Sequence, residues 1–86
     1  YRVKGSSMAP NFNDNDLVLA TKFLKQIKVN DVVVLDIPKF GAVLKRVQFL
    51  NDDEIRVIGD NKEYKSPIYD MKLYKNNIVG KVLYKF

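Results

Sequence analysis

The 86-residue chain contains no cysteine, no histidine and no tryptophan. Without thiols and imidazoles there can be no disulfide framework, no zinc site of the usual ligand types, no cysteine nucleophile and no histidine-based triad. Any catalysis must therefore use hydroxyl, carboxylate or amine groups, and we expect no metal ion and no cofactor. Long apolar runs are also missing, because the longest aliphatic run, residues 32–35, is far short of the ~20 residues that a membrane-spanning helix requires.

Acidic side chains are fewer than basic ones: 10 Asp and Glu stand against 15 Lys and Arg, which gives a formal net charge of +5. Most of the cations are lysines scattered along the chain, and only three are arginine, the residue preferred for bidentate recognition of phosphates and bases. We interpret the excess as a solvated, lysine-rich surface and expect no nucleic-acid partner. The alternative from another class is a non-catalytic β-barrel that binds single-stranded nucleic acid, because such domains are basic and rich in aromatic residues.

Strand signals dominate the sequence. Five short segments are rich in β-branched or aromatic residues and are separated by Asn, Asp, Gly and Pro clusters: residues 17–20, 32–37, 42–50, 54–58 and 78–86. The turn-forming residues 51–53 predict a hairpin between the third and fourth segments. Helical periodicity is weak, with one turn expected in residues 21–28 and another in 69–75. We predict a mostly β fold of short antiparallel strands, forming a single domain over residues 1–86.

Two Asn-Asp pairs are expected to form turns. Asn15-Asp16 and Asn30-Asp31 each precede an apolar segment. Asx side chains in this setting bond to nearby backbone groups. Each pair is therefore predicted to start a buried strand.

The aromatic residues divide into two groups. The phenylalanines lie mostly in or beside the strand segments, so we expect them to fill the core: Phe12, Phe23, Phe40, Phe49 and Phe86. Tyr64, Tyr69 and Tyr74 are candidates for the edge of a peptide cleft, where an extended substrate can pair with an exposed strand.

One turn carries a candidate nucleophile. The chain has few Ser or Thr hydroxyls, and two of them, Ser6 and Ser7, lie in the segment Gly5-Ser6-Ser7-Met8-Ala9-Pro10. Gly5 permits unusual backbone dihedrals, and Pro10 fixes the direction in which the chain leaves the turn. Such a turn can present a serine hydroxyl together with its own N–H. The alternative interpretation is an ordinary polar turn.

Lys45 is the candidate base. Strand alternation places it on one face with Val43, Val47 and Phe49, while Arg46 points the other way as an ordinary surface cation. A lysine with the reference pKa of about 10.4 is neutral in roughly one molecule in 2,500 at pH 7, but desolvation on an apolar face can lower that pKa by ~3–5 units. A neutral lysine can take the proton of a serine hydroxyl, as histidine does in the commoner dyads. The alternative is a lysine that snorkels out of the apolar face.

Six motifs follow one another along most of the chain. They are Val3-x-Gly5-x-Ser7-Met8-x-Pro10, Asn15-Asp16-Leu17-Val18, Asn30-Asp31-Val32-Val33-Val34, Lys45-Arg46-Val47, Gly59-Asp60-Asn61 and Ile78-Val79-Gly80-Lys81-Val82. In combination they resemble the bacterial type I signal peptidases, whose wider superfamily includes the self-cleaving SOS and phage repressors. The separation of 38 positions between Ser7 and Lys45 suits the Ser–Lys dyad of that family.

The resemblance implies a role for each candidate site residue. Ser7 would be the nucleophile with its backbone N–H as an oxyanion donor, and Lys45 would be the general base that later serves as acid. Met8 would line the substrate cleft or, alternatively, pack in the core. Gly59-Asp60-Asn61 would end a strand and support the site, and Ser66 would hold the lysine amine in place.

The chain also departs from the family pattern. Gly5 stands where some members have a second hydroxyl for the oxyanion, and Asn replaces Gly in both Asn-Asp pairs. After the Gly-Asp-Asn box, Ser66 lies one residue late, the following aspartate is displaced to Asp70, and the arginine is absent. Only 14 positions separate Lys45 from Gly59, which leaves no room for the large inserted domain of many signal peptidases.

By this resemblance we expect a serine endopeptidase that removes leader or signal peptides, with a precursor protein as its partner. Two relatives are alternatives: a maturation protease that trims the leader of nickel-type superoxide dismutase, and a self-cleaving SOS or phage repressor domain. A membrane surface is a further expected partner. If an anchor precedes Tyr1, we expect the catalytic domain outside the cytoplasm, and otherwise a cytoplasmic protein.

Overall fold

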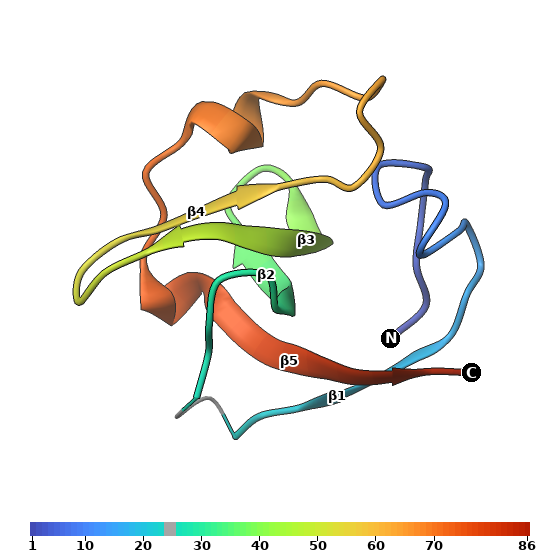
Figure 1. Ribbon diagram of the computed structural model, residues 1–86, viewed down its shortest axis with the longest axis horizontal. Helices are drawn as coiled ribbons and strands as arrows, with labels where there is room; N and C mark the ends of the chain where they lie inside the picture. Colours follow the sequence, from blue (N-terminus) through green and yellow to red (C-terminus); the bar gives the residue numbers. More distant parts are fainter. Residues whose placement is uncertain (24–25) are drawn as a thin grey trace.

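A computed structural model describes residues 1–23 and 26–86 and shows one twisted sheet with the N-terminal segment beside it (Figure 1). Five strands pair antiparallel in the order β1-β5-β2-β3-β4. Their bounds are β1 (Val18–Thr21), β2 (Val32–Ile37), β3 (Gly41–Leu50), β4 (Ile55–Ile58) and β5 (Ile78–Lys85). The predicted mostly β fold is confirmed, and each strand lies where the sequence placed it to within one residue at either end.

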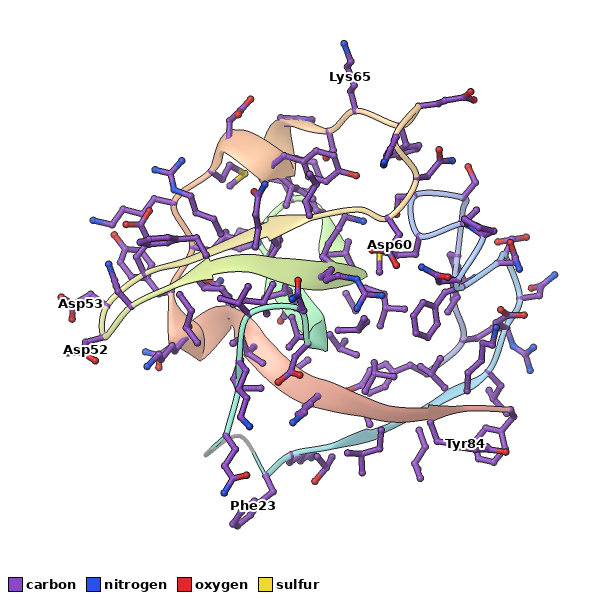
Figure 2. The ribbon with its side chains drawn as sticks, viewed as in Figure 1. Phe23, Asp52, Asp53, Asp60, Lys65 and Tyr84 are labelled. Atoms are coloured by element: carbon purple, nitrogen blue, oxygen red, sulfur yellow. The ribbon has the colours of Figure 1, made fainter. Side chains whose placement is uncertain are left out.

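The hairpin predicted around residues 51–53 is formed by β3 and β4. The side-chain oxygen of Asn51 accepts hydrogen bonds from the backbone N–H groups of Asp53 and Glu54, at 2.9 and 2.7 Å. These bonds close the turn, which extends far from the rest of the sheet with Asp52 and Asp53 at its tip (Figure 2).

The two Asn-Asp pairs form the same turn twice. Asn15 and Asn30 have positive φ angles of 73° and 79°, which is the left-handed region that Asn tolerates better than most residues. The carboxylate of Asp16 accepts from the N–H three residues earlier at 2.8 Å, and the carboxylate of Asp31 does the same at 2.8 Å. The predicted Asx bonding is confirmed, and the repeat in the sequence is a repeated turn.

The core lies on the face of the sheet that Lys45 shares. Its buried apolar members come from β2, β3, β4 and β5 and from the segment between β4 and β5: Val33, Leu35, Ile37, Val47, Ile55, Val57, Ile68, Leu73 and Ile78. Two short 3₁₀ helices, η1 (Pro67–Asp70) and η2 (Lys75–Asn77), lie in the connection between β4 and β5. One helical turn was expected in residues 69–75, and the two 3₁₀ helices overlap the two ends of that range. The other turn, expected in residues 21–28, lies partly outside the described residues. Within residues 1–23 and 26–86, no helix is long and apolar enough to span a membrane.

The expected alternation along β3 is confirmed for Val43, Lys45 and Val47 but is wrong for Phe49. The pairing with β4 shifts register between Val47 and Phe49. Such a bulge exchanges the two faces of a strand. As a result Phe49 is exposed, and Leu50 packs against the core in its place.

The phenylalanines do not fill the core, which corrects the sequence expectation. Four of them are exposed: Phe23, Phe40, Phe49 and Phe86. Phe12 is half-buried and lies under the ammonium group of Lys85 at 5.8 Å. The core is built from β-branched and Leu side chains instead.

Candidate active site

Ser7 lies in a tight turn beside the sheet. Gly5 has a φ angle of 79°, a conformation that side chains with a Cβ rarely adopt, and its N–H donates to the carboxylate of Asp14 at 2.8 Å. The N–H of Ala9 donates to the carbonyl of Ser6 at 3.1 Å. The Ser7 residue itself is only 8% exposed. The segment from Gly5 to Pro10 therefore forms the predicted turn, and Ser7 is buried within it.

Lys45 reaches Ser7 from the middle of β3. It pairs with Val33 of β2 and is only 5% exposed. A hydrogen bond joins Lys45 Nζ and Ser7 Oγ at 2.7 Å, and a second runs from Nζ to the carbonyl of Leu44 at 3.2 Å. Nζ donates in both contacts; when the amine is neutral, its lone pair can instead accept the hydrogen bond from the Ser7 hydroxyl across the same two atoms. The structure thus brings the two residues together as the sequence predicted.

Burial shifts the protonation of this pair toward the form a base needs. Desolvation lowers the pKa of Lys45 below its ordinary value of 10.5, because an ammonium group loses its hydration among apolar neighbours. No carboxylate forms an ion pair with Lys45 in the part of the chain that the structure describes. Nothing there opposes the shift.

The segment Gly59-Asp60-Asn61 holds the serine turn in place. The backbone N–H of Asn61 donates to the Ser7 carbonyl at 2.9 Å, and its side-chain amide donates to the Ser6 carbonyl at 3.0 Å. The N–H of Asp60 donates to the sulfur of Met8 at 3.4 Å. The segment follows β4 directly, so the sheet itself positions the turn that carries Ser7.

Arg46 and Asp60 tie the two halves of the site together. The guanidinium binds both carboxylate oxygens, with two contacts of 2.7 Å, and Asn11 donates to the same carboxylate at 2.9 Å. The hydrogen bond from Arg46 holds the pKa of Asp60 below its ordinary value. Sequence reasoning treated Arg46 as an ordinary surface cation and missed this role. Its place next to Lys45, on the opposite face of the strand, was the available signal.

Gly59 makes a close approach that no other residue allows. A Cβ atom at this position would lie 2.5 Å from the Ser7 carbonyl oxygen and would also collide with the Tyr69 hydroxyl. That hydroxyl is buried and has no hydrogen-bond partner among the described residues, and burial raises the pKa of Tyr69. The φ angle of Gly59 is not positive, so its backbone conformation does not call for glycine. Glycine is required here because there is no space for a Cβ atom.

The backbone N–H of Ser7 is the group that the family resemblance names as the oxyanion donor. No hydrogen bond from this group is found within residues 1–23 and 26–86. Gly5 supplies no hydroxyl as a second donor, as expected from its side chain. Backbone N–H groups beside a nucleophile are the usual donors to the oxygen of a tetrahedral intermediate.

A cavity of about 520 Å³ opens beside the Ser7–Lys45 pair. Met8, only 1% exposed, forms part of its buried wall, so this residue both packs in the interior and lines the cleft. Tyr64 lies at the wall as predicted, whereas Tyr69 packs against the core and Tyr74 does not line the cavity. Among the described residues, no group of three His, Cys, Asp or Glu side chains is placed to hold a metal ion.

Comparison with known families decides the classification. Residues 1–83 match the family described as Peptidase S24-like, which is nearly the whole chain. The chain belongs to the Peptidase S24-like family. A comparison with curated proteins gives no match.

Membership of the S24-like family supports a serine peptidase of the SOS-repressor and signal-peptidase type. It is consistent with the five-stranded antiparallel sheet and with the family resemblance drawn from the motifs. The family does not specify which peptide bonds this chain cleaves.

Ser66 of this S24-like chain differs from its expected arrangement. The Ser66 hydroxyl accepts a hydrogen bond from the N–H of Ile68 at 3.2 Å and caps η1. Ser66 lines the same cavity as Lys45, yet in the described part of the chain the partners of Nζ are Ser7 and Leu44. The predicted bond from Ser66 to the lysine amine is therefore not made, and the Ser66 hydroxyl caps η1 instead. Asp70 is the exposed last residue of η1.

Replacement of Gly59 by alanine should lower both stability and activity, although Gly59 is neither Ser7 nor Lys45. The added Cβ collides with the Ser7 carbonyl, and overpacking of this kind costs about 1–3 kcal/mol of unfolding free energy. We expect kcat to fall with little change in KM, because the turn that carries Ser7 must move. Chemical denaturation and peptide hydrolysis measure the two effects.

The double variant Gly59→Ala/Tyr69→Phe separates the two collisions. Tyr69→Phe removes a buried hydroxyl without a partner, so alone it should be neutral or stabilising. In the double variant the clash with Ser7 remains, and we expect activity to stay low. Full recovery would show that the contact with Tyr69, and not the displacement of Ser7, is what matters.

Proposed function

We propose that this chain is a Ser–Lys endopeptidase that removes leader or signal peptides from precursor proteins. The observation that carries the proposal is the 2.7 Å hydrogen bond between Ser7 Oγ and Lys45 Nζ, made by two buried side chains that are 38 positions apart. A charged lysine is costly to bury without a carboxylate. A neutral lysine in contact with a buried hydroxyl has the arrangement of a nucleophile and its base.

Each step of peptide hydrolysis can be assigned to these two residues. Neutral Lys45 takes the hydroxyl proton as Ser7 Oγ bonds to the carbonyl carbon of the scissile peptide, and the Ser7 N–H stabilises the oxyanion that forms. The Lys45 ammonium then protonates the departing amine of the substrate. This leaves an ester on Ser7 and returns Lys45 to its neutral form. Lys45 next takes a proton from water, the resulting hydroxide attacks the ester, and Ser7 recovers its proton as the acid product leaves.

The surroundings support this chemistry. Asn61 donates to the carbonyl groups of Ser6 and Ser7, and Asp60 binds Arg46, the residue next to Lys45. Nucleophile and base are thus connected through a second route besides their own hydrogen bond. This limits relative movement, and misplacement by about 1 Å can cost about 100-fold in rate.

Self-cleavage is the second candidate function. Family membership favours it, since the S24-like type includes repressors as well as signal peptidases. In that case Ser7 and Lys45 act on a bond of the same polypeptide. A maturation protease for nickel-type superoxide dismutase remains a variant of the leading proposal, with another precursor as substrate.

The test is cleavage in trans combined with capture of the ester. The protein is incubated with precursors that carry N-terminal leaders, and intact mass spectrometry follows both partners after an acid quench. We expect a single endoproteolytic cut and an acyl adduct on the tryptic peptide that contains Ser7. An adduct on another residue would overturn the proposed nucleophile, and cleavage only within the chain's own polypeptide would favour self-cleavage.

A further inference from the structure

The cavity beside Ser7 carries positive charge on its walls and no negative charge. Besides Lys45, its lining includes the cationic residues Arg2, Lys4 and Lys65, and none of its lining residues is Asp or Glu. The chain as a whole has 10 acidic residues for 15 basic ones. A cavity wall without a single carboxylate therefore differs from the mixed surface elsewhere.

The three cations at the rim are not neutralised by the protein. The ion pairs of the described residues lie elsewhere: Arg46–Asp60, Arg56–Glu54, Lys81–Asp31 and Lys85–Asp16. Arg2 donates to the uncharged backbone carbonyl of Asn15 at 3.1 Å. Lys4 and Lys65 are exposed, and Lys65 extends away from the body of the molecule in Figure 2.

No carboxylate that neighbours the lining residues in the sequence lines the cavity itself. Asp60 binds Arg46, and Asp14 accepts the N–H of Gly5. Glu63 precedes Tyr64 on an exposed stretch and does not line the cavity. The ionisable Lys, Arg, Asp and Glu residues of the cavity lining are therefore all basic, and a cleft lined by charges of one sign attracts ligands of the opposite sign.

We propose that this cavity selects peptides that carry Asp or Glu close to the scissile bond. This rests on the proposed endopeptidase function and names its substrate class. Arg2 and Lys4 are the principal contacts, because both belong to the segment that leads into the Ser7 turn. Lys65 contributes less, since its side chain points outward. Placing the acidic groups at the rim also keeps them from stabilising the charged form of Lys45, which must be neutral to react.

The test uses a set of neutral peptides cleaved by the wild-type protein, each with one flanking position changed to Asp or to Lys. We expect the ratio of kcat/KM for the best acidic peptide over its Lys counterpart to be at least about fivefold at low ionic strength, and to decline as salt is added. Lys4→Glu should lower this ratio several-fold or invert it, and Lys65→Glu should lower it less.

Lys75→Glu is the matched control, because it changes the net charge equally on η2, and Lys75 does not line the cavity. Its ratio should equal that of the wild type. If the wild type cleaved acidic and basic peptides with equal kcat/KM, the proposed charge preference would be wrong but the endopeptidase function would stand. If it cleaved none of the peptides, the result would count against the endopeptidase function. A single-stranded oligonucleotide that inhibits hydrolysis more strongly than an acidic peptide of equal charge would assign the cations to nucleic acid and overturn the proposal.

Discussion

Replacement of Ser7 by alanine is expected to lower kcat for leader-peptide cleavage by on the order of 10⁵- to 10⁶-fold, with the fold intact. The substitution removes the oxygen that attacks the peptide carbonyl, and nucleophiles of this kind contribute on that scale in serine proteases. Stability should change by only about 1 kcal/mol, because one hydrogen bond, from Lys45 Nζ at 2.7 Å, is lost. Circular dichroism and thermal unfolding check the fold, and peptide hydrolysis checks the rate.

Ser6→Ala is the matched control for this variant. Ser6 is the neighbouring serine, it is exposed, and its contacts to Ala9 and Asn61 are made by its backbone carbonyl. We expect it to keep most of the activity and the acyl adduct on Ser7. If Ser7→Ala cleaved peptides at more than a tenth of the wild-type rate, Ser7 would not be the nucleophile.

Lys45→Met should abolish cleavage to a similar extent and, at neutral pH, leave the fold as stable as the wild type or more so. Methionine keeps a long unbranched side chain on the apolar face of β3 but has no basic nitrogen. Lys45→Arg is the informative companion, since guanidinium stays protonated and cannot accept the serine proton. If positive charge alone served the reaction, the arginine variant would stay active; we expect it to be inactive and less stable.

The pH dependence of wild-type stability and rate follows from the lowered pKa of Lys45. In the unfolded chain this lysine titrates near 10.5, so between the lower folded pKa and that value the unfolded state binds more protons. Unfolding free energy therefore rises with pH across this window, and below it the buried ammonium costs stability. We expect the stability advantage of Lys45→Met to shrink as the pH rises toward 10.5.

The rate should follow the same group. The value of kcat/KM reports the free enzyme, and it should increase with pH as Lys45 loses its proton, with a midpoint below 10.5. The chain has no histidine whose titration could overlap with this limb. A midpoint no lower than that of a free lysine would contradict a desolvated base.

The strands could be read from the sequence because their signals are local. β-branched runs separated by Asx, Gly and Pro residues lie where the five strands lie, and the repeated Asn-Asp pairs mark the same turn. The phenylalanines could not be placed in this way. Alternation assigns a face only while the register is regular, and the bulge after Val47 turned Phe49 outward.

In the candidate site, too, some features could be predicted from the sequence and others could not. Ser7 and Lys45 could be named because a chain without imidazole or thiol needs another base for a serine, and because both lie in recognisable motifs. The role of Arg46 and the capping of η1 by Ser66 could not be predicted from the sequence. Each depends on which hydrogen-bond partner lies nearest in space.

By itself, the sequence determined the chemistry that is available. Zero histidines and zero cysteines leave hydroxyl, carboxylate and amine groups for any catalysis, and β-branched runs dictate a sheet. Only the tertiary structure decided that Nζ lies 2.7 Å from Oγ, that the amine is desolvated, and that the cavity wall holds cations without carboxylates. The physical reason is that hydrogen bonds, desolvation and electrostatic fields depend on distances between residues that are far apart in the chain.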